Sequence, residues 1–129
     1  MIHVIDTHPL VWFLEANPKL SESVRGTLSD PTSQIVIPMI VLAEIVYLYD
    51  KKRINTASDE VKELVGRCDN CTLYPLDEAV IERIPTGLDI HDGLIVATAL
   101  VFQETLGEEV SVVTKDREIT ESNLVRVEW

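Results

Sequence analysis

Short apolar runs alternate along this chain with longer segments of helical period. The apolar runs have the length of β-strands and cover residues 2–6, 34–37, 72–76, 110–114 and 124–127. Strands that alternate with helical segments are typical of a parallel sheet whose strands are joined by crossover helices. The sequence therefore predicts an α/β fold.

Helix-start and helix-stop residues mark the segments between these runs. We expect helices over residues 8–15, 21–29, 39–52, 58–67, 77–84 and 92–106. Ser21 and Asp77 suit the N-cap position, Pro38 suits a first helical turn, and Gly107 suits a helix end. The segment 56–59 resembles a capping box. No repeat or linker interrupts the pattern, so residues 1–129 are expected to form a single domain.

The charge and hydropathy of the chain restrict the classes of function. A net charge of −11 argues against a general polyanion-binding surface, which usually needs a basic footprint. The longest apolar stretch, residues 35–49, is too short to span a membrane and is interrupted by Pro38 and Glu44. No basic leader precedes the first apolar run, so we expect a cytoplasmic protein with no membrane partner.

Two local groups of cations and one pair of cysteines stand out. Candidate RNA-contacting residues are Lys51, Lys52, Arg53, Lys115 and Arg117. The alternative for the 51–53 run is a solvated helix C-terminus, where cations suit the helix dipole. Cys68 and Cys71 form a single Cys-x-x-Cys, whereas a structural zinc site usually needs four ligands. We expect ordinary thiols there, or at most a local disulfide.

Four carboxylates lie in or beside apolar segments. Asp6 closes the first apolar run, Glu44 interrupts the helical segment 39–52, Asp92 opens the segment 92–106, and Asp116 follows the fourth strand. An ionised carboxylate in apolar surroundings is costly unless it is paired or binds a metal. Because ligands gather beyond the carboxyl ends of parallel strands, we expect these four groups to converge there.

Each of the four carboxylates also has a structural alternative. Asp6 suits a turn or a helix cap, Asp92 suits the cap of the long helix, and Asp116 suits a turn where it pairs with Lys115 or Arg117. Glu44 has only apolar neighbours at helical spacing, so we expect it to be buried without a cation on its own helix.

The group as a whole predicts a divalent-cation site. Carboxylates that lie close together repel one another unless a cation is present, and hard oxygen ligands suit one or two Mg²⁺ or Mn²⁺ ions. Such a site indicates phosphoryl-transfer chemistry. Thr7 and Thr114 are expected to orient the carboxylates or a bound water, while His8, His91, Asp89 and Glu118 are weaker candidates for outer positions.

Four ordered segments resemble the PIN domain family, specifically its VapC-type toxins. They are Val4-Ile5-Asp6-Thr7, Val41-Leu42-Ala43-Glu44, the run from Ile90 to Ala99, and Val113-Thr114-Lys115-Asp116. The resemblance spans essentially the whole chain and implies a three-layer α/β/α fold with a central, mostly parallel sheet. It also implies a Mg²⁺- or Mn²⁺-dependent endoribonuclease that forms a homodimer and is silenced by a cognate antitoxin. Gly93 and Ile119 depart from the residues common in that family.

Three other functions remain open at this stage. One is a catalytically inert PIN-like module that binds RNA or a protein, which the acidic balance favours. Another is a PIN nuclease that processes RNA with no toxin role. The third is an aspartyl-nucleophile phosphohydrolase, but those enzymes carry a second Asp two residues after the first, where this chain has His8.

Overall fold

The computed structural model describes residues 1–129 and contains one five-stranded sheet with the order β3-β2-β1-β4-β5. Every neighbouring pair of strands is parallel. The strands are β1 (Ile2–Ile5), β2 (Gln34–Pro38), β3 (Cys71–Tyr74), β4 (Val110–Val113) and β5 (Arg126–Glu128). The α/β fold and the parallel sheet are thus confirmed.

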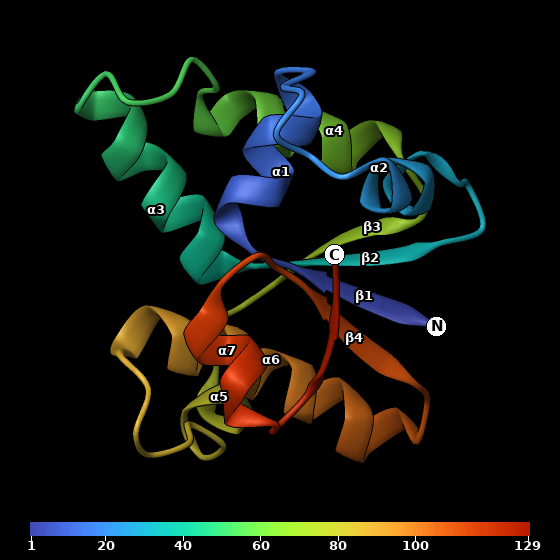
Figure 1. Ribbon diagram of the computed structural model, residues 1–129, viewed down its shortest axis with the longest axis vertical. Helices are drawn as coiled ribbons and strands as arrows, with labels where there is room; N and C mark the ends of the chain where they lie inside the picture. Colours follow the sequence, from blue (N-terminus) through green and yellow to red (C-terminus); the bar gives the residue numbers. More distant parts are fainter.

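Seven helices surround this sheet. They are α1 (Thr7–Leu14), α2 (Glu22–Ser29), α3 (Met39–Asp50), α4 (Ser58–Arg67), α5 (Glu78–Ile81), α6 (Ile90–Leu106) and α7 (Arg117–Ser122). In Figure 1, α1, α2 and α4 cover one face of the sheet, and α5 and α6 lie on the other. This is the three-layer α/β/α arrangement. No helix is both long enough and apolar enough to cross a membrane.

Strand β1 is the centre of the sheet and the point where its order reverses. The chain passes from β1 to β2 and β3 on one side, and then to β4 and β5 on the other. All four residues of β1 and all four of β4 are buried, because helices cover both faces. The carboxyl ends of β1 and β4 therefore lie side by side at the position where open α/β sheets bind ligands.

Helix α6 packs against these two strands and is buried along most of its first half. Residues 92–99 are all buried, so the polar side chain of Asp92 lies within an otherwise apolar helix. Gly93 permits close packing there, since a Cβ atom at this position would lie 3.3 Å from the Ile84 side chain. Ile119, the other departure from the family pattern, is fully buried in the core.

Most predicted caps are confirmed, and the exceptions have local causes. Ser21 and Asp77 accept hydrogen bonds from Val24 N and Val80 N, and Gly107 ends α6 with a φ of 64°. The capping box at residues 56–59 was wrong, because Ala57 is the N-cap of α4 and makes no side-chain bond. Pro38 was predicted in the first turn of a helix, but it is the N-cap of α3, one residue before the helix begins.

Several elements also differ from their predicted bounds, and one helix was not predicted. Helix α7 was missed because it has six residues and buries only Ile119, too little for a helical period to be visible. Strand β5 begins two residues later than expected.

Cys68 and Cys71 are free thiols, and burial, with a smaller effect of Cys68, raises the pKa of Cys71 to about 11.

Candidate metal centre

Asp6 follows β1 and forms the N-cap of α1. Its Oδ1 accepts a hydrogen bond from Thr7 N at 2.7 Å, and its Oδ2 accepts one from Thr114 Oγ1 at 2.7 Å. His91 Nε2 lies 3.3 Å from Oδ1. Burial would raise the pKa of Asp6, but the hydrogen bonds from His91, Thr114 and Thr7 outweigh it and hold the pKa below its usual value. Asp6 is thus a buried carboxylate that stays ionised.

Thr114 connects the end of β4 to two of the predicted acids. Besides donating to Asp6, its Oγ1 accepts a hydrogen bond from Asp116 N at 3.0 Å. Asp116 in turn caps α7, where its Oδ1 accepts from Glu118 N at 2.8 Å and from Ile119 N at 3.1 Å. The alternative of a turn residue paired with a neighbouring cation was wrong for Asp116, since it forms no ion pair.

Asp92 lies in the first turn of α6 and is 5% exposed. It does not cap this helix; the cap is Asp89, whose Oδ1 accepts from Asp92 N at 3.0 Å. Burial most of all, and then the carboxylates of Asp116, Asp89 and Asp6, raise the pKa of Asp92 to about 7, against a smaller opposing effect of His91. Asp92 also forms no ion pair, so the carboxylates around it outweigh the one nearby cationic group, His91.

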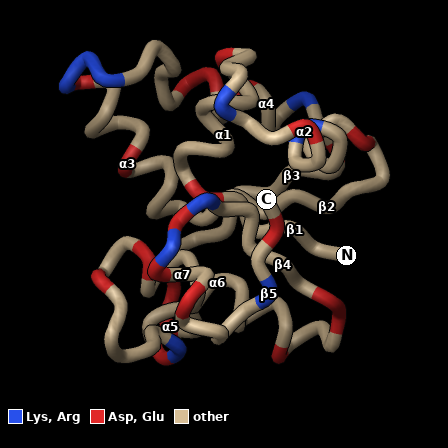
Figure 2. The backbone as a smooth tube through the Cα atoms, viewed as in Figure 1, with Lys and Arg blue, Asp and Glu red and all other residues tan.

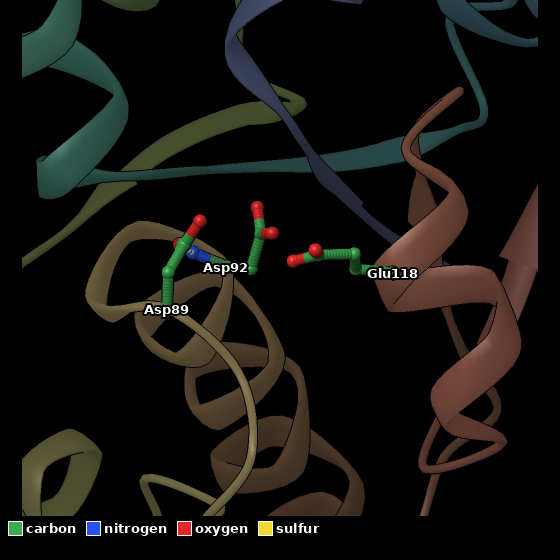
Figure 3. A group of neighbouring side chains, drawn as sticks. All are labelled: Asp89, Asp92 and Glu118. Carbon is green, nitrogen blue, oxygen red and sulfur yellow. Dashed lines mark hydrogen bonds between the residues drawn. The ribbon is translucent and has the colours of Figure 1, made fainter.

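Two acids that the sequence indicated only weakly lie beside Asp92. Carboxylate oxygens of Asp89, Asp92 and Glu118 lie within 4.8 Å of one another. Figure 3 shows Asp89 where the chain enters α6, Asp92 on the first turn of that helix, and Glu118 reaching toward them from α7. Glu118 could not be ranked higher from the sequence, because the helix that carries it was not predicted.

Glu44 joins the site through a histidine. Its side chain is 28% exposed, and its Oε2 lies 3.3 Å from His91 Nδ1. Glu44 is therefore less buried than expected, and its partner comes from α6, since its own helix offers no cation at helical spacing. The outward side of α3 instead carries the exposed apolar groups Val46, Tyr47 and Tyr49.

His91 is the residue that the sequence most undervalued. It bridges Asp6 and Glu44 through its two ring nitrogens. The hydrogen bond to Asp6 raises the pKa of His91, burial opposes this, and the charges of Glu44, Asp6 and Asp92 add to the increase. One signal in the sequence does indicate His91: it directly precedes Asp92, so both residues lie in the first turn of α6.

The structure thus brings three predicted acids together and attaches the fourth indirectly. Asp6, Asp92 and Asp116 lie close enough for their charges to interact, and Glu44 contacts them only through His91. Thr7 is fully buried beside Asp6, and its Oγ1 has no hydrogen-bond partner. His8 is exposed on α1 and contacts Trp12 instead of an acid.

The five candidate cations are dispersed. Figure 2 shows the 51–53 run beyond the far end of α3, away from α6 and α7. Arg117 pairs with Glu121 at 3.1 Å. Lys115 lies between Thr114 and Asp116 and has its Nζ 5.9 Å from the Trp129 ring. Only Lys115 and Arg117 are therefore neighbours of the acids along the chain.

A divalent cation fits this set of donors. The candidate ligands are all carboxylate oxygens, which suit a hard ion such as Mg²⁺ or Mn²⁺. The pKa of about 7 for Asp92 agrees with this, because the group is only partly ionised at neutral pH and a bound cation would favour its ionised form. Fold and site together define a three-layer α/β/α protein with a candidate metal centre at the carboxyl edge of its parallel sheet.

Comparison with known proteins identifies the family. The PIN domain model matches residues 3–122, and the chain belongs to this family. The fold is similar to a chain of VapBC2 from Rickettsia felis bound to a DNA fragment from its promoter, with a TM-score of 0.68 and 19% identity over 100% of this chain and 99% of that one. No curated protein matches the sequence.

A second solved structure has the same fold. VapBC-1 from nontypeable Haemophilus influenzae aligns with a TM-score of 0.64 and 16% identity, over 99% of this chain and 97% of the other. At these identities the likeness concerns the fold.

Proposed function

We propose that this protein is a divalent-metal-dependent endoribonuclease that hydrolyses RNA phosphodiester bonds in the cytoplasm. The observation that carries the proposal is Asp92, a buried carboxylate that forms no ion pair and lies among carboxylates whose effect on its pKa outweighs that of His91. Membership of the PIN family agrees with it. A site that needs positive charge, at the ligand-binding edge of an α/β sheet, is suited to a metal and a phosphate.

In this proposal Asp6, Glu44, Asp92 and Asp116 hold one or two Mg²⁺ or Mn²⁺ ions. When bound, the metal supplies an activated water and neutralises charge on the phosphodiester. Thr114 fixes the orientation of Asp6 through its 2.7 Å hydrogen bond, and the α7 backbone fixes Asp116. His91 positions Glu44 relative to Asp6. Asp89 and Glu118 are the additional carboxylates nearest Asp92.

We further propose that the protein is the toxin of a type II toxin–antitoxin pair, acting as a homodimer and inhibited by a cognate antitoxin. The support is similarity in fold, over nearly the full length of both chains, to chains of two VapBC structures. The alternatives are an inert PIN-like module, which the net charge of −11 favours, and an RNA-processing nuclease without a toxin role.

Cleavage of pooled cellular RNA tests the enzymatic proposal. Purified protein is incubated with Mn²⁺, with EDTA, and as the Asp92→Asn variant, with Glu109→Gln as a matched control because Glu109 is exposed and lies away from the site. We expect discrete cuts that EDTA and Asp92→Asn abolish and that Glu109→Gln retains. If the protein shows neither cuts nor a Mn²⁺-induced thermal shift, the inert module is favoured.

Co-expression tests the toxin role. Expression of the wild-type protein alone is expected to arrest growth, and co-expression of the small protein encoded beside it is expected to restore growth. Growth that the active nuclease leaves unaffected would instead favour the RNA-processing enzyme.

A further inference from the structure

A groove of about 660 Å³ lies between α1 and α3 and reaches the candidate metal centre. Its walls combine aromatic and cationic side chains with one site residue: His8, Trp12, Lys19, Glu44, Tyr47 and Arg53. Because Glu44 also contacts His91, which in turn contacts Asp6, one end of the groove is connected to the candidate metal centre through these two residues.

Aromatic rings and lysines are paired along this side of the molecule. Lys19 lies 5.9 Å from the ring centre of Trp12, and Lys51 lies 5.7 Å from that of Tyr47. Trp12 meets Trp129 edge-on at 5.8 Å, and Lys115 covers Trp129 at 5.9 Å. The row of rings therefore runs from Tyr47 on α3, past α1, to the loop that carries Asp116.

The cations of the groove are available to a ligand, whereas its acids are not. Lys19 and Arg53 form no ion pair with a carboxylate. Glu15 accepts hydrogen bonds from Asn55 N at 3.0 Å and Thr56 Oγ1 at 2.7 Å, and Glu44 contacts His91. In a chain with a net charge of −11, this groove is thus less acidic than the average surface, with two cations that are free to contact an anion and two acids that are already bonded within the protein.

We propose that the groove binds single-stranded RNA and leads its backbone to the metal centre. Bases stack on the exposed ring of Tyr47 and on His8 over Trp12, while Lys19 and Arg53 contact phosphates. A duplex keeps its bases stacked inside, so only an unpaired strand can present them to these rings. This inference rests on the proposed ribonuclease function and assigns its substrate path.

The lining of the groove also shows which residue of the 51–53 run is the best candidate for contacting RNA. Only Arg53 of that run lines it, while Lys51 lies over Tyr47. Lys52 lines a separate groove, between α3 and α4, together with Tyr49. Tyr49 is therefore a matched control for Tyr47, because both lie on α3 and their exposed fractions are similar, 51% and 55%.

Fluorescence anisotropy with a labelled, unstructured RNA of about 12 nucleotides tests the proposal in EDTA, where cleavage is excluded. Because base–aromatic stacking contributes strongly to such binding, we expect Tyr47→Leu to weaken affinity about 5- to 100-fold and Tyr49→Leu to leave it unchanged. Lys19→Ala is expected to lower the slope of log K against log salt by about 0.7, whereas Lys62→Ala on α4 should not. Annealing the complementary strand should abolish binding.

Parallel Mn²⁺-dependent cleavage assays separate this proposal from the proposed function. If the wild type cleaves RNA but all four variants bind and cleave like it, the groove proposal is overturned, the nuclease stands, and a protein ligand becomes the better occupant of the groove. If binding depends on Tyr47 but Mn²⁺ induces no cleavage, the groove stands and the nuclease does not. A wild type that neither binds nor cleaves overturns both.

Discussion

Strands β1 and β4 carry two carboxylate networks, one along the strands and one beyond their ends, and the two networks have opposite electrostatic character. The register pairs His3 with Ser111, and both side chains contact Glu128 of β5. Beyond the carboxyl ends of the same strands lie Asp6 and Thr114, beside Asp92.

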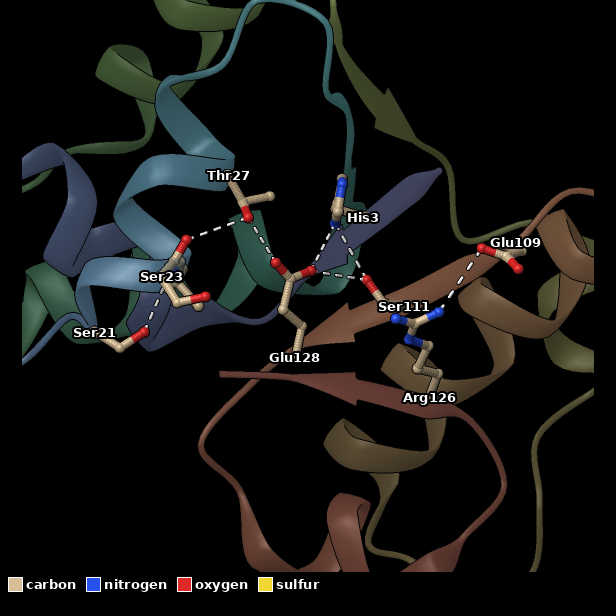
Figure 4. A network of polar contacts seen from close by, with 9 residues as sticks. His3, Ser21, Ser23, Thr27, Glu109, Ser111, Arg126 and Glu128 are labelled. Carbon is tan, nitrogen blue, oxygen red and sulfur yellow. Dashed lines mark hydrogen bonds and ion pairs between the residues drawn. The ribbon is translucent and has the colours of Figure 1, made fainter.

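The network around Glu128 is closed, as Figure 4 shows. Glu128 Oε1 accepts from Thr27 Oγ1 at 2.6 Å, and Oε2 accepts from Ser111 Oγ at 3.1 Å and lies 2.8 Å from His3 Nδ1. Burial would raise the pKa of Glu128, but these contacts lower it below its usual value. A half-buried acid surrounded by donors is a structural element that ties β5 and α2 to the sheet.

The network around Asp92 is open, because carboxylates surround it instead of donors. Burial acts in the same direction on both acids, yet the pKa of Asp92 is raised to about 7. Burial alone therefore does not identify a candidate functional carboxylate. The distinguishing feature is a deficit of positive charge that a ligand can fill.

Cleavage activity should separate the two networks most strongly. We expect Asp92→Asn to reduce Mn²⁺-dependent RNA cleavage by at least about 100-fold, because it removes a ligand of the metal that would activate water and neutralise charge on the phosphodiester. Glu128→Gln should retain activity at a temperature where it is folded. Initial rates on one labelled RNA measure both. Equal loss in the two variants would mean that the networks are not functionally distinct.

Metal binding should follow the same division. A ligand at about 100 times its Kd adds about 2.7 kcal/mol of stability, which raises the Tm of a domain of this size by several degrees. We expect Mn²⁺ to produce this shift in the wild type and in Glu128→Gln, and to produce little or none in Asp92→Asn. Differential scanning fluorimetry after EDTA treatment measures it, with Ca²⁺ and K⁺ as comparison ions. A full shift in Asp92→Asn would place the metal elsewhere.

The open site was easier to predict from sequence than the closed one. Asp6 and Asp116 follow apolar runs, and the rule that strand ends share one edge of a parallel sheet is enough to bring them together. Contacts between side chains distant in sequence give no such signal. Glu44 and His91 are examples, because helical spacing around Glu44 shows only apolar residues.

Short elements with little buried surface account for the other differences. Helix α7 buries one residue, so its period is invisible, and Glu118 was undervalued with it. The Glu128 network was missed for a related reason: β5 has three residues, and none of them is fully buried. The long, apolar elements β1, β4 and α6 were predicted because burial on several sides leaves a continuous apolar run in the sequence.

The pH dependence of stability in EDTA should have opposite signs at the two acids. The folded pKa of Glu128 is lowered, so its contribution is present above the unfolded value of 4.5 and is lost as the pH falls. The folded pKa of Asp92 is raised, so its contribution is present below the unfolded value of 3.8 and is lost as the pH rises through about 7.

Two variants test these signs by urea unfolding between pH 3 and pH 8. At pH 7, Glu128→Gln is expected to cost about 1.5–3 kcal/mol, the usual range for hydrogen bonds to a charged group, and the cost should shrink toward pH 3. Glu109→Gln should cost almost nothing, since Glu109 is 76% exposed. Asp92→Asn should leave stability unchanged or increased at pH 8. A cost for Asp92→Asn that grows with pH would reverse the sign assigned to it.

Two buried threonines beside the acids should give the smallest difference. Thr114 Oγ1 links Asp6 to Asp116 N, whereas Thr7 Oγ1 has no partner. Thr114→Val should therefore cost about 1–3 kcal/mol, while Thr7→Val should be neutral or slightly stabilising, because it removes an unsatisfied hydroxyl at nearly constant shape. If Thr7→Val leaves the urea midpoint in EDTA unchanged but lowers the Mn²⁺-induced shift, the hydroxyl faces the bound metal or its water. If the midpoint falls as much as in Thr114→Val, Thr7 has a hydrogen-bond partner in the folded protein, and the contrast between the two threonines is lost.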